Sequence, residues 1–157
     1  MIKTKITDLF DTEGIAYRVL PHEGAVFTIE EAAKQRDVVP EEMVKSILLR
    51  DKKQHYVMAC VPGPARLDPQ AVRVYLPGHY SRLTFATAAE ILEVTGYVQG
   101  AVAPLCLPDD VPVIFDKALA FCARVNISSG DPIAGLELAG PDLMWMARAQ
   151  VGSIVKE

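Results

Sequence analysis

The apolar positions near the start of the chain first follow a helical period and then a strand period. Ile6, Leu9 and Phe10 recur at helical spacing, and Gly14 suits the left-handed position that ends a helix. The pattern predicts a helix that ends near Glu13. Alternation over residues 15–20 then predicts a strand, which the following proline stops or leaves at a sheet edge.

Other strand-like segments are bounded by glycine, proline or polar turns. Val44–Arg50 and His55–Val61 flank the polar turn 51–54 and are predicted to form a hairpin. Shorter strands are expected at 81–85, 111–116, 125–128 and 135–138.

Capping signals locate the remaining helices. Thr28 with Glu31, and Thr87 with Glu90, have the spacing of a capping box, so helices are expected from these points to about Arg36 and Gly96. A one-turn helix at residues 40–42, a helix at 69–75, a turn or short helix at 117–122 and a final helix from 140 complete the prediction.

Several neighbouring strands are joined by connections too short for a crossover helix. The pattern therefore predicts an α+β fold with a mixed, largely antiparallel sheet and helices packed on it. With 157 residues, half of them hydrophobic, the chain is expected to form a single domain over residues 1–157.

Composition and charge exclude several classes of protein. The net charge of −4 gives no global basic field for nucleic acid. The first residues lead into a patterned helix rather than a signal peptide, and no run of eighteen apolar residues occurs, so we expect a cytoplasmic protein outside the membrane. The scattered cysteines (Cys60, Cys106, Cys122) and histidines (His22, His55, His79) predict reduced core thiols and no metal site.

No conventional catalytic motif is present. The sequence lacks a Gly-x-Ser-x-Gly elbow, a phosphate-binding loop and a dinucleotide fingerprint. Cys106, between Leu105 and Leu107, resembles a core thiol more than a nucleophile. The remaining candidates are polar groups on loops and strand ends, namely His22, Lys45, the amides around Gly100 and the turn 128–131.

Lys45 has two interpretations. In a strand it shares a face with Ile47 and Leu49, so on the core face its ammonium would lie at the rim of an apolar pocket and need polar or anionic partners. Alternatively, it is a lysine at a strand end that extends into water.

Four motifs occur in a distinctive order and spacing along essentially the whole chain. They are His22 ahead of Phe27-Thr28-x-Glu30-Glu31-Ala32-Ala33, then Val44-Lys45-Ser46-Ile47-Leu48-Leu49, then Gly96-Tyr97-x-x-Gly100-x-Val102-x-Pro104, and Ile127-Ser128-Ser129-Gly130. Together they resemble the YbaK and prolyl-tRNA-synthetase-associated editing-domain family. The resemblance implies a curved mixed sheet flanked by helices, and an aminoacyl-tRNA deacylase without metal or cofactor that hydrolyses mischarged tRNA.

The resemblance also assigns site residues. Lys45 would anchor the terminal adenosine phosphate or orient the aminoacyl end, and the amides of Gly100 and Ala101 would face the oxygen that becomes negative. The implied substrate-binding residues are Thr28, the pocket wall Ser128, Ser129 and Gly130, and His22 at the mouth.

Two departures from the family pattern concern specificity. Ala101 stands where many relatives have a second glycine, which would add a methyl group to the pocket floor. Asp131 follows the glycine where some relatives have basic residues, and would weaken phosphate binding or meet a substrate amine. The amino acid removed stays open among alanine, serine, threonine and cysteine.

Three hypotheses follow for function. The first is a deacylase that acts in trans on the acceptor end of aminoacyl-tRNA. The second is a non-catalytic module that binds aminoacyl-tRNA, a nucleotide or a synthetase, and in the third Lys45 is only a solvated strand residue. An acidic protein would recruit tRNA through a synthetase partner or a local patch such as Lys52, Lys53, Arg66 and Arg73. The oligomeric state cannot be inferred from the sequence.

Overall fold

The computed structural model describes residues 2–157, and Met1 lies outside the described part. The helices are α1 (Lys5–Glu13), α2 (Ile29–Arg36), the single 3₁₀ turn η1 (Pro40–Glu42), α3 (Pro69–Tyr75), α4 (Ala88–Thr95), α5 (Lys117–Ala120) and α6 (Gly140–Ala147). The strands are β1 (Tyr17–Pro21), β2 (Val44–Arg50), β3 (Tyr56–Pro62), β4 (Thr84–Phe85), β5 (Val113–Asp116), β6 (Arg124–Ser128), β7 (Ala134–Ala139) and β8 (Gln150–Gly152).

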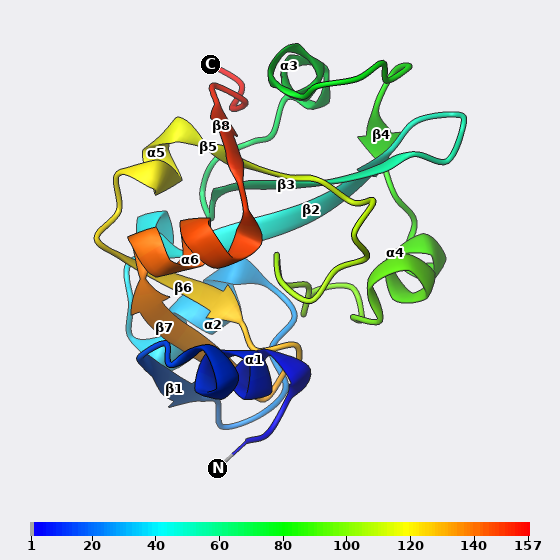
Figure 1. Ribbon diagram of the computed structural model, residues 1–157. Coiled ribbons are helices and arrows are strands. Elements are labelled where there is room, and N and C mark those ends of the chain that lie inside the picture. Colours follow the sequence, from blue (N-terminus) through cyan, green and yellow to red (C-terminus); the bar gives the residue numbers. More distant parts are fainter. Residues whose placement is uncertain (1) are drawn as a thin grey trace.

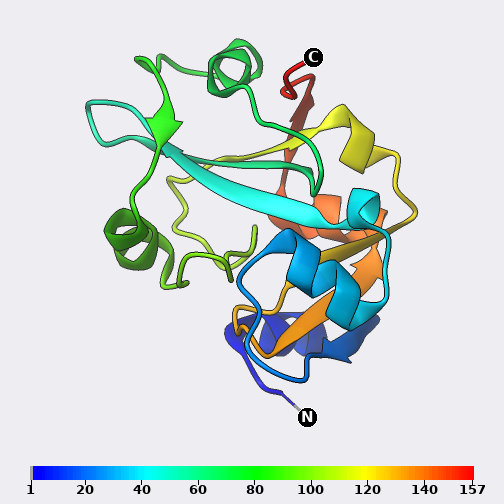
Figure 2. The same cartoon turned by 180° about the vertical axis from the view of Figure 1, so that it is seen from behind.

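The strands form two sheets, which confirms the predicted α+β class. A three-stranded sheet has the order β1-β7-β6, and a five-stranded sheet has the order β4-β2-β3-β5-β8. The pairs β3–β5 and β5–β8 are parallel and all other strand pairs are antiparallel. A parallel bridge between Met43 and Asn126 connects the two sheets. Figures 1 and 2 show α1 and α2 on opposite faces of the three-stranded sheet.

Helix ends follow the capping signals in the sequence. Gly14 ends α1 with φ 69° in the left-handed region, and the Thr87–Glu90 capping box starts α4. At α2 the box is incomplete. Thr28 accepts the N–H of Glu31, but the Glu31 carboxylate accepts from the Thr28 hydroxyl at 3.0 Å instead of from the Thr28 backbone.

Alternation along β2 divides its side chains between two parts of the core. Val44 and Leu48 pack into the larger cluster with α1, whereas Leu49 packs into a second cluster with α3. Lys45 points to the side of this second cluster, because it alternates with Val44. A third, small apolar cluster lies between α2 and the start of β2 and includes Ala32 and Met43. This last cluster lies next to the cavity described below.

The sequence pattern missed one strand and shifted another. β8 follows α6 and pairs in parallel with β5, although its first two residues are exposed. Three residues are too short for a periodic signal. β1 begins at Tyr17 rather than residue 15 and ends at Pro21, an edge position that a residue without an N–H tolerates. Within residues 2–157, no helix is long and apolar enough to cross a bilayer.

Candidate functional site

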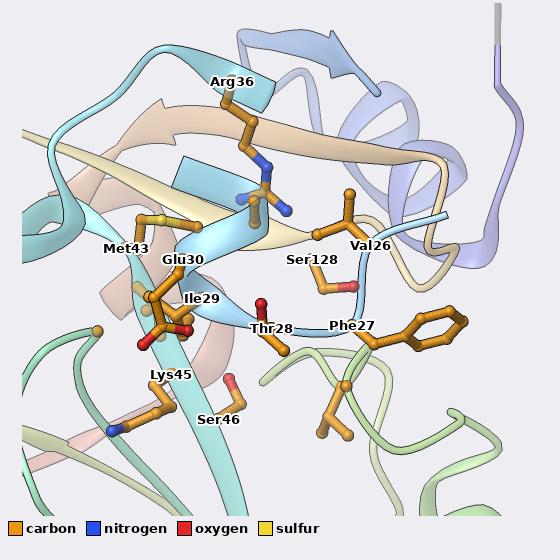
Figure 3. A pocket seen from close by; sticks show the side chains of 15 residues that line it. Val26, Phe27, Thr28, Ile29, Glu30, Arg36, Met43, Lys45, Ser46 and Ser128 are labelled. Atoms are coloured by element: carbon orange, nitrogen blue, oxygen red, sulfur yellow. The ribbon is translucent and has the colours of Figure 1, made fainter. Parts of the chain in front are cut away.

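A cavity of about 370 Å³ lies where the two sheets meet, a size typical of small-ligand sites. Its walls come from α2 and the preceding loop, the start of β2, the loop after α4 and the end of β6 (Figure 3). Of the residues predicted for the site, the structure brings Thr28, Lys45, Gly100 and Ser128 to this cavity. The full lining is Val26, Phe27, Thr28, Ile29, Glu30, Ala32, Arg36, Met43, Val44, Lys45, Ser46, Gly63, Gly100, Val102 and Ser128.

Lys45 is half-buried at the start of β2. Its Nζ donates a hydrogen bond to the carbonyl oxygen of Ala65, and it forms no ion pair among residues 2–157. Burial lowers the pKa of the Lys45 ammonium, and the negative charge of Glu30 acts in the opposite direction. Figure 3 shows Glu30 and Lys45 on the same side of the cavity. The ammonium is therefore held by a polar partner and keeps donor capacity for a ligand.

Gly100 brings the loop after α4 against the segment that precedes α2. Its φ is 90°, and a Cβ at this position would lie 2.7 Å from the carbonyl oxygen of Phe27. Both the backbone conformation and the space require glycine. In the described part of the chain its N–H has no hydrogen-bond acceptor, and the residue lines the cavity.

The structure contradicts the role expected for Ala101. Its N–H donates to the carbonyl oxygen of Val98 at 3.0 Å, and its side chain is buried and does not line the cavity. A donor already used in a turn does not serve an oxyanion. The methyl group also adds nothing to the pocket floor, so the expected effect on pocket size was wrong.

Of the predicted pocket wall at residues 128–130, only Ser128, the last residue of β6, lines the cavity. The Ser128 hydroxyl accepts the N–H of Gly130 at 3.0 Å. The buried Ser129 hydroxyl donates to the carbonyl oxygen of Ala134 at 2.7 Å. Neither Ser129 nor Gly130 lines the cavity, because both shape the turn behind it. The Asp131 carboxylate accepts the Ile133 N–H at 3.0 Å within this turn, and its expected effect on phosphate or amine binding stays a prediction.

His22 contacts the cavity residue Arg36 and is not itself a lining residue. Its Nδ1 is 2.8 Å from the carbonyl oxygen of Pro132, and its Nε2 accepts from Arg36 Nε at 3.1 Å. A carbonyl oxygen only accepts, so Nδ1 carries the proton and the ring is neutral. Burial and the neighbouring guanidinium lower the pKa of His22, although the bond to Pro132 acts in the opposite direction. Arg36, and not His22, is the lining residue here, so a contact of His22 with substrate at the pocket mouth stays a prediction.

Sequence reasoning missed three polar residues of the cavity. Glu30 lies in the same motif as Thr28, and Ser46 follows Lys45 directly, so the sequence motifs already pointed to both positions. Arg36 gave no signal, because an arginine in the last turn of a helix is typical of a solvated surface. The remaining wall is formed by Gly63 and by the apolar residues Val26, Phe27, Ile29, Ala32, Met43, Val44 and Val102.

Two further expectations change in the structure. Cys106 is exposed, with φ 59°, and its thiol donates to the carbonyl oxygen of Lys5 at 3.6 Å, so it is not a core thiol. Lys52 and Lys53 lie in the turn at one end of the β2–β3 hairpin, whereas Arg66 follows the other end of β3 (Figure 1). A seven-residue strand spans roughly 20 Å, so these residues do not form one patch. Among residues 2–157, no group of three or more potential metal ligands is found.

Comparison with known proteins identifies the family. The profile of the aminoacyl-tRNA editing domain matches residues 23–145, which include every polar residue of the cavity. The chain belongs to the aminoacyl-tRNA editing-domain family. The resemblance inferred from the four motifs is thereby confirmed.

Relatives of this editing domain include proline–tRNA ligases. The enzyme of Kosmotoga olearia is 35% identical over 91 residues, which are 58% of this chain and 15% of that protein. The enzyme of Aquifex aeolicus is 27% identical over 111 residues, 71% of this chain and 19% of that protein. The chain thus spans less than a quarter of the length of these relatives.

Solved structures share the fold over the whole chain. The protein APE2540 matches with a TM-score of 0.87 and 27% identity, covering 98% of this chain and all of that one. A candidate trans-editing enzyme for prolyl-tRNA synthetase matches with a TM-score of 0.83 and 24% identity, covering 100% of both chains.

Proposed function

We propose that this editing domain is a deacylase that acts in trans and hydrolyses the ester bond of tRNA carrying a small, wrong amino acid. The carrying observation is that one cavity gathers Lys45 and the free N–H of Gly100 with the hydroxyl groups of Thr28 and Ser128. These are a cation, a fixed amide donor and polar contacts, which are the groups that binding the acceptor end and stabilising an oxyanion require.

The chemistry needs no side-chain nucleophile. A water molecule, which the neighbouring hydroxyl group of the terminal ribose can orient, attacks the ester carbonyl carbon, and negative charge develops on the carbonyl oxygen. The Gly100 N–H donates to that carbonyl oxygen. The bond from the carbonyl carbon to the ribose oxygen then breaks, the proton of the water passes to that ribose oxygen, and the free amino acid leaves. Lys45 binds the phosphate of the terminal nucleotide as a point charge, which places the ester next to the loop. Binding and orientation then supply much of the rate enhancement.

The apolar wall supports a small amino acid as the group removed. Val26, Met43 and Val102 offer apolar contacts to a short side chain beside the polar groups. A cavity of this kind excludes large residues but separates alanine from serine or cysteine by only a methyl- or hydroxyl-sized difference. Because the relatives are proline–tRNA ligases, tRNA specific for proline is the first substrate to test.

The test is release of free amino acid from tRNA specific for proline that carries alanine, serine, threonine, cysteine or proline. Wild type is expected to hydrolyse one or more of the small aminoacyl esters and to spare the prolyl ester. Lys45→Ala is expected to lose this activity while circular dichroism and the melting temperature show a folded protein. Lys53→Ala, which removes an exposed lysine of the β2–β3 turn, is the matched control and should keep wild-type activity.

Two results would contradict the proposal. Saturable binding of aminoacyl-tRNA without product would favour the non-catalytic binding module. Undiminished hydrolysis by a folded Lys45→Ala variant would leave Lys45 as a strand residue without a role in the reaction.

A further inference from the structure

Arg36 is a charged residue of the cavity to which the proposed reaction assigns no role. It stands at the end of α2, is half-buried, and lines the same cavity as Lys45. Figure 3 shows its guanidinium directed into the pocket on the side of Val26 and Ser128, with Lys45 on the opposite side. The cavity therefore presents two separate cationic positions.

The guanidinium of Arg36 has no anionic partner. Among residues 2–157 it forms no ion pair, and its one hydrogen bond runs from Nε to His22 Nε2 at 3.1 Å. The two Nη groups have no acceptor in this part of the chain. Burial lowers the pKa of Arg36 to about 10, so the group stays a cation at neutral pH. A partly desolvated cation without a counter-charge gains when an anion binds it.

Gly135 provides the space in which the guanidinium lies. A Cβ on this residue of β7 would be 2.0 Å from Arg36 Cζ and 2.1 Å from its Nε. Gly135 does not have a positive φ, so the backbone conformation alone does not demand glycine there. Glycine at position 135 is therefore needed for space, because the Arg36 guanidinium lies against this strand. The hydrogen bond to His22 fixes the orientation of the guanidinium at its Nε.

We propose that Arg36 binds an oxyanion of the bound substrate through its two Nη groups. The planar fork matches the two oxygens of a carboxylate or a phosphate, which a lysine cannot do. The source of the anion rests on the proposed function. For the small aminoacyl groups proposed above it is a phosphate near the 3′ end of tRNA. A side-chain carboxylate on the aminoacyl group is the alternative that the second pair of probes below tests.

Binding of small probes tests this site without any hydrolysis. 5′-Phosphocytidylyl-(3′→5′)-adenosine carries a second phosphate beyond the phosphodiester proposed to bind Lys45, and cytidylyl-(3′→5′)-adenosine lacks that second phosphate. If the anion is a phosphate, Arg36→Met is expected to weaken the phosphorylated dinucleotide by about tenfold or more in isothermal titration and to leave the unphosphorylated one unchanged. Lys34→Met, an exposed lysine on the same helix, is the matched control and should bind both probes like wild type.

A second pair of probes tests the carboxylate. The 3′-aspartylamido and 3′-alanylamido derivatives of 3′-deoxyadenosine are stable amides that differ in one carboxylate. If the anion belongs to the aminoacyl group, Arg36→Met weakens the aspartyl compound alone. Equal affinities of wild type and Arg36→Met for every probe, or no binding of any probe to wild type, would overturn the proposal.

Two variants separate anion binding from a structural role. Gly135→Ala keeps the charge but displaces the guanidinium, and is expected to cause the same selective loss. Arg36→Lys keeps a cation without the fork and should lose only part of the affinity, which gives a folded comparison if Arg36→Met is unstable. Because binding is measured directly, absence of deacylation in wild type would refute the proposed function without deciding the role of Arg36.

Discussion

At the level of single residues, Gly100 combines a positive φ with a position where no side chain fits. Gly100→Ala is expected to displace the loop from Phe27, lowering stability by about 1–2 kcal/mol and the deacylation kcat by about 100-fold. Chemical denaturation and single-turnover hydrolysis measure the two effects. Gly24→Ala is the control, because Gly24 has no positive φ and nothing within 4 Å of its added Cβ. A Gly100→Ala variant with wild-type kcat would exclude the Gly100 amide from the reaction.

His22 gives the protein a stability that depends on pH near neutrality. Its pKa in the folded state is lowered from the ordinary 6.5, chiefly because of burial. At pH values between the folded-state pKa and 6.5, the unfolded chain therefore binds more protons than the folded one. Stability should therefore fall as the pH drops through 6.5 and level off below the folded pKa. The groups that face the ring are the Arg36 guanidinium from α2 and the Pro132 carbonyl from the turn before β7.

The measurement is the free energy of unfolding between pH 5 and pH 8 for wild type and for His22→Gln. Subtracting the two curves isolates the contribution of His22, because the other titrating groups are common to both proteins. The difference is expected to grow in favour of wild type as the pH rises through this range. A difference that does not vary with pH would show that the His22 ring does not titrate in a buried, paired environment.

Motif order in the sequence identified the part of the site that is fixed by local structure. Thr28 caps a helix, Lys45 begins a strand and Gly100 allows a tight loop, and each role is readable from neighbouring residues. The error at Ala101 has a different origin, because sequence does not specify where an individual N–H points. Arg36 could not be predicted, since its setting depends on a glycine in a remote strand.

At the level of elements, Asp51 organises the turn of the β2–β3 hairpin. This buried carboxylate accepts the N–H groups of Lys53, His55 and Ser81. These bonds, together with the His55 side chain, hold its pKa at about 2, despite burial acting in the opposite direction. Asp51→Asn replaces one acceptor oxygen by a donor and is expected to cost about 2–3 kcal/mol of stability. Urea denaturation at pH 7 measures the loss.

The lowered pKa of Asp51 also predicts how the cost of Asp51→Asn changes at acid pH. The stabilisation by this carboxylate is complete above the ordinary value of 3.8 and is lost as the pH falls towards 2. The cost of Asp51→Asn should therefore shrink in this range, whereas Asp109→Asn, at an exposed carboxylate, should cost little at any pH. A cost that is constant from pH 7 to pH 2 would contradict an ionised Asp51 at the centre of the turn.

Helix caps and the hairpin could be predicted because each rests on residues close in sequence. The complete box at Thr87 and the turn between β2 and β3 are such cases. The division into two sheets and the strand β8 depend on pairing between remote segments, such as Phe115 with Val151 and Met43 with Asn126. Such pairing is set by the packing of the whole core. A short segment has too few residues for its hydrophobic pattern to predict its partner strand.

At the level of the whole molecule, the cavity lies where the two sheets meet. β2 and β6 belong to different sheets, and both contribute polar groups to the cavity, Lys45 and Ser46 from one and Ser128 from the other. α2 lies beside the Met43–Asn126 bridge region and adds Glu30 and Arg36. The protein has a net charge of −4, and Lys52 and Lys53 lie at the far end of the hairpin from this cavity. Attraction of the substrate phosphates therefore depends on the cations of the cavity itself, Lys45 and Arg36.

Salt dependence measures how many such cations meet phosphate. Each phosphate contact with a single strand contributes a slope of about −0.7 to the logarithm of affinity against the logarithm of salt concentration. If Lys45 and Arg36 are the contacts to the unpaired 3′ end, the slope for wild type should be about −1.4, and Lys45→Ala should bring it to about −0.7. Titration of a non-hydrolysable aminoacyl-tRNA at several salt concentrations gives both values. The double variant Lys52→Ala, Lys53→Ala, at the far end of the hairpin, is the control and should leave the slope unchanged. A steeper wild-type slope that this double variant reduces would show that the hairpin turn, and not the cavity, binds the tRNA phosphates.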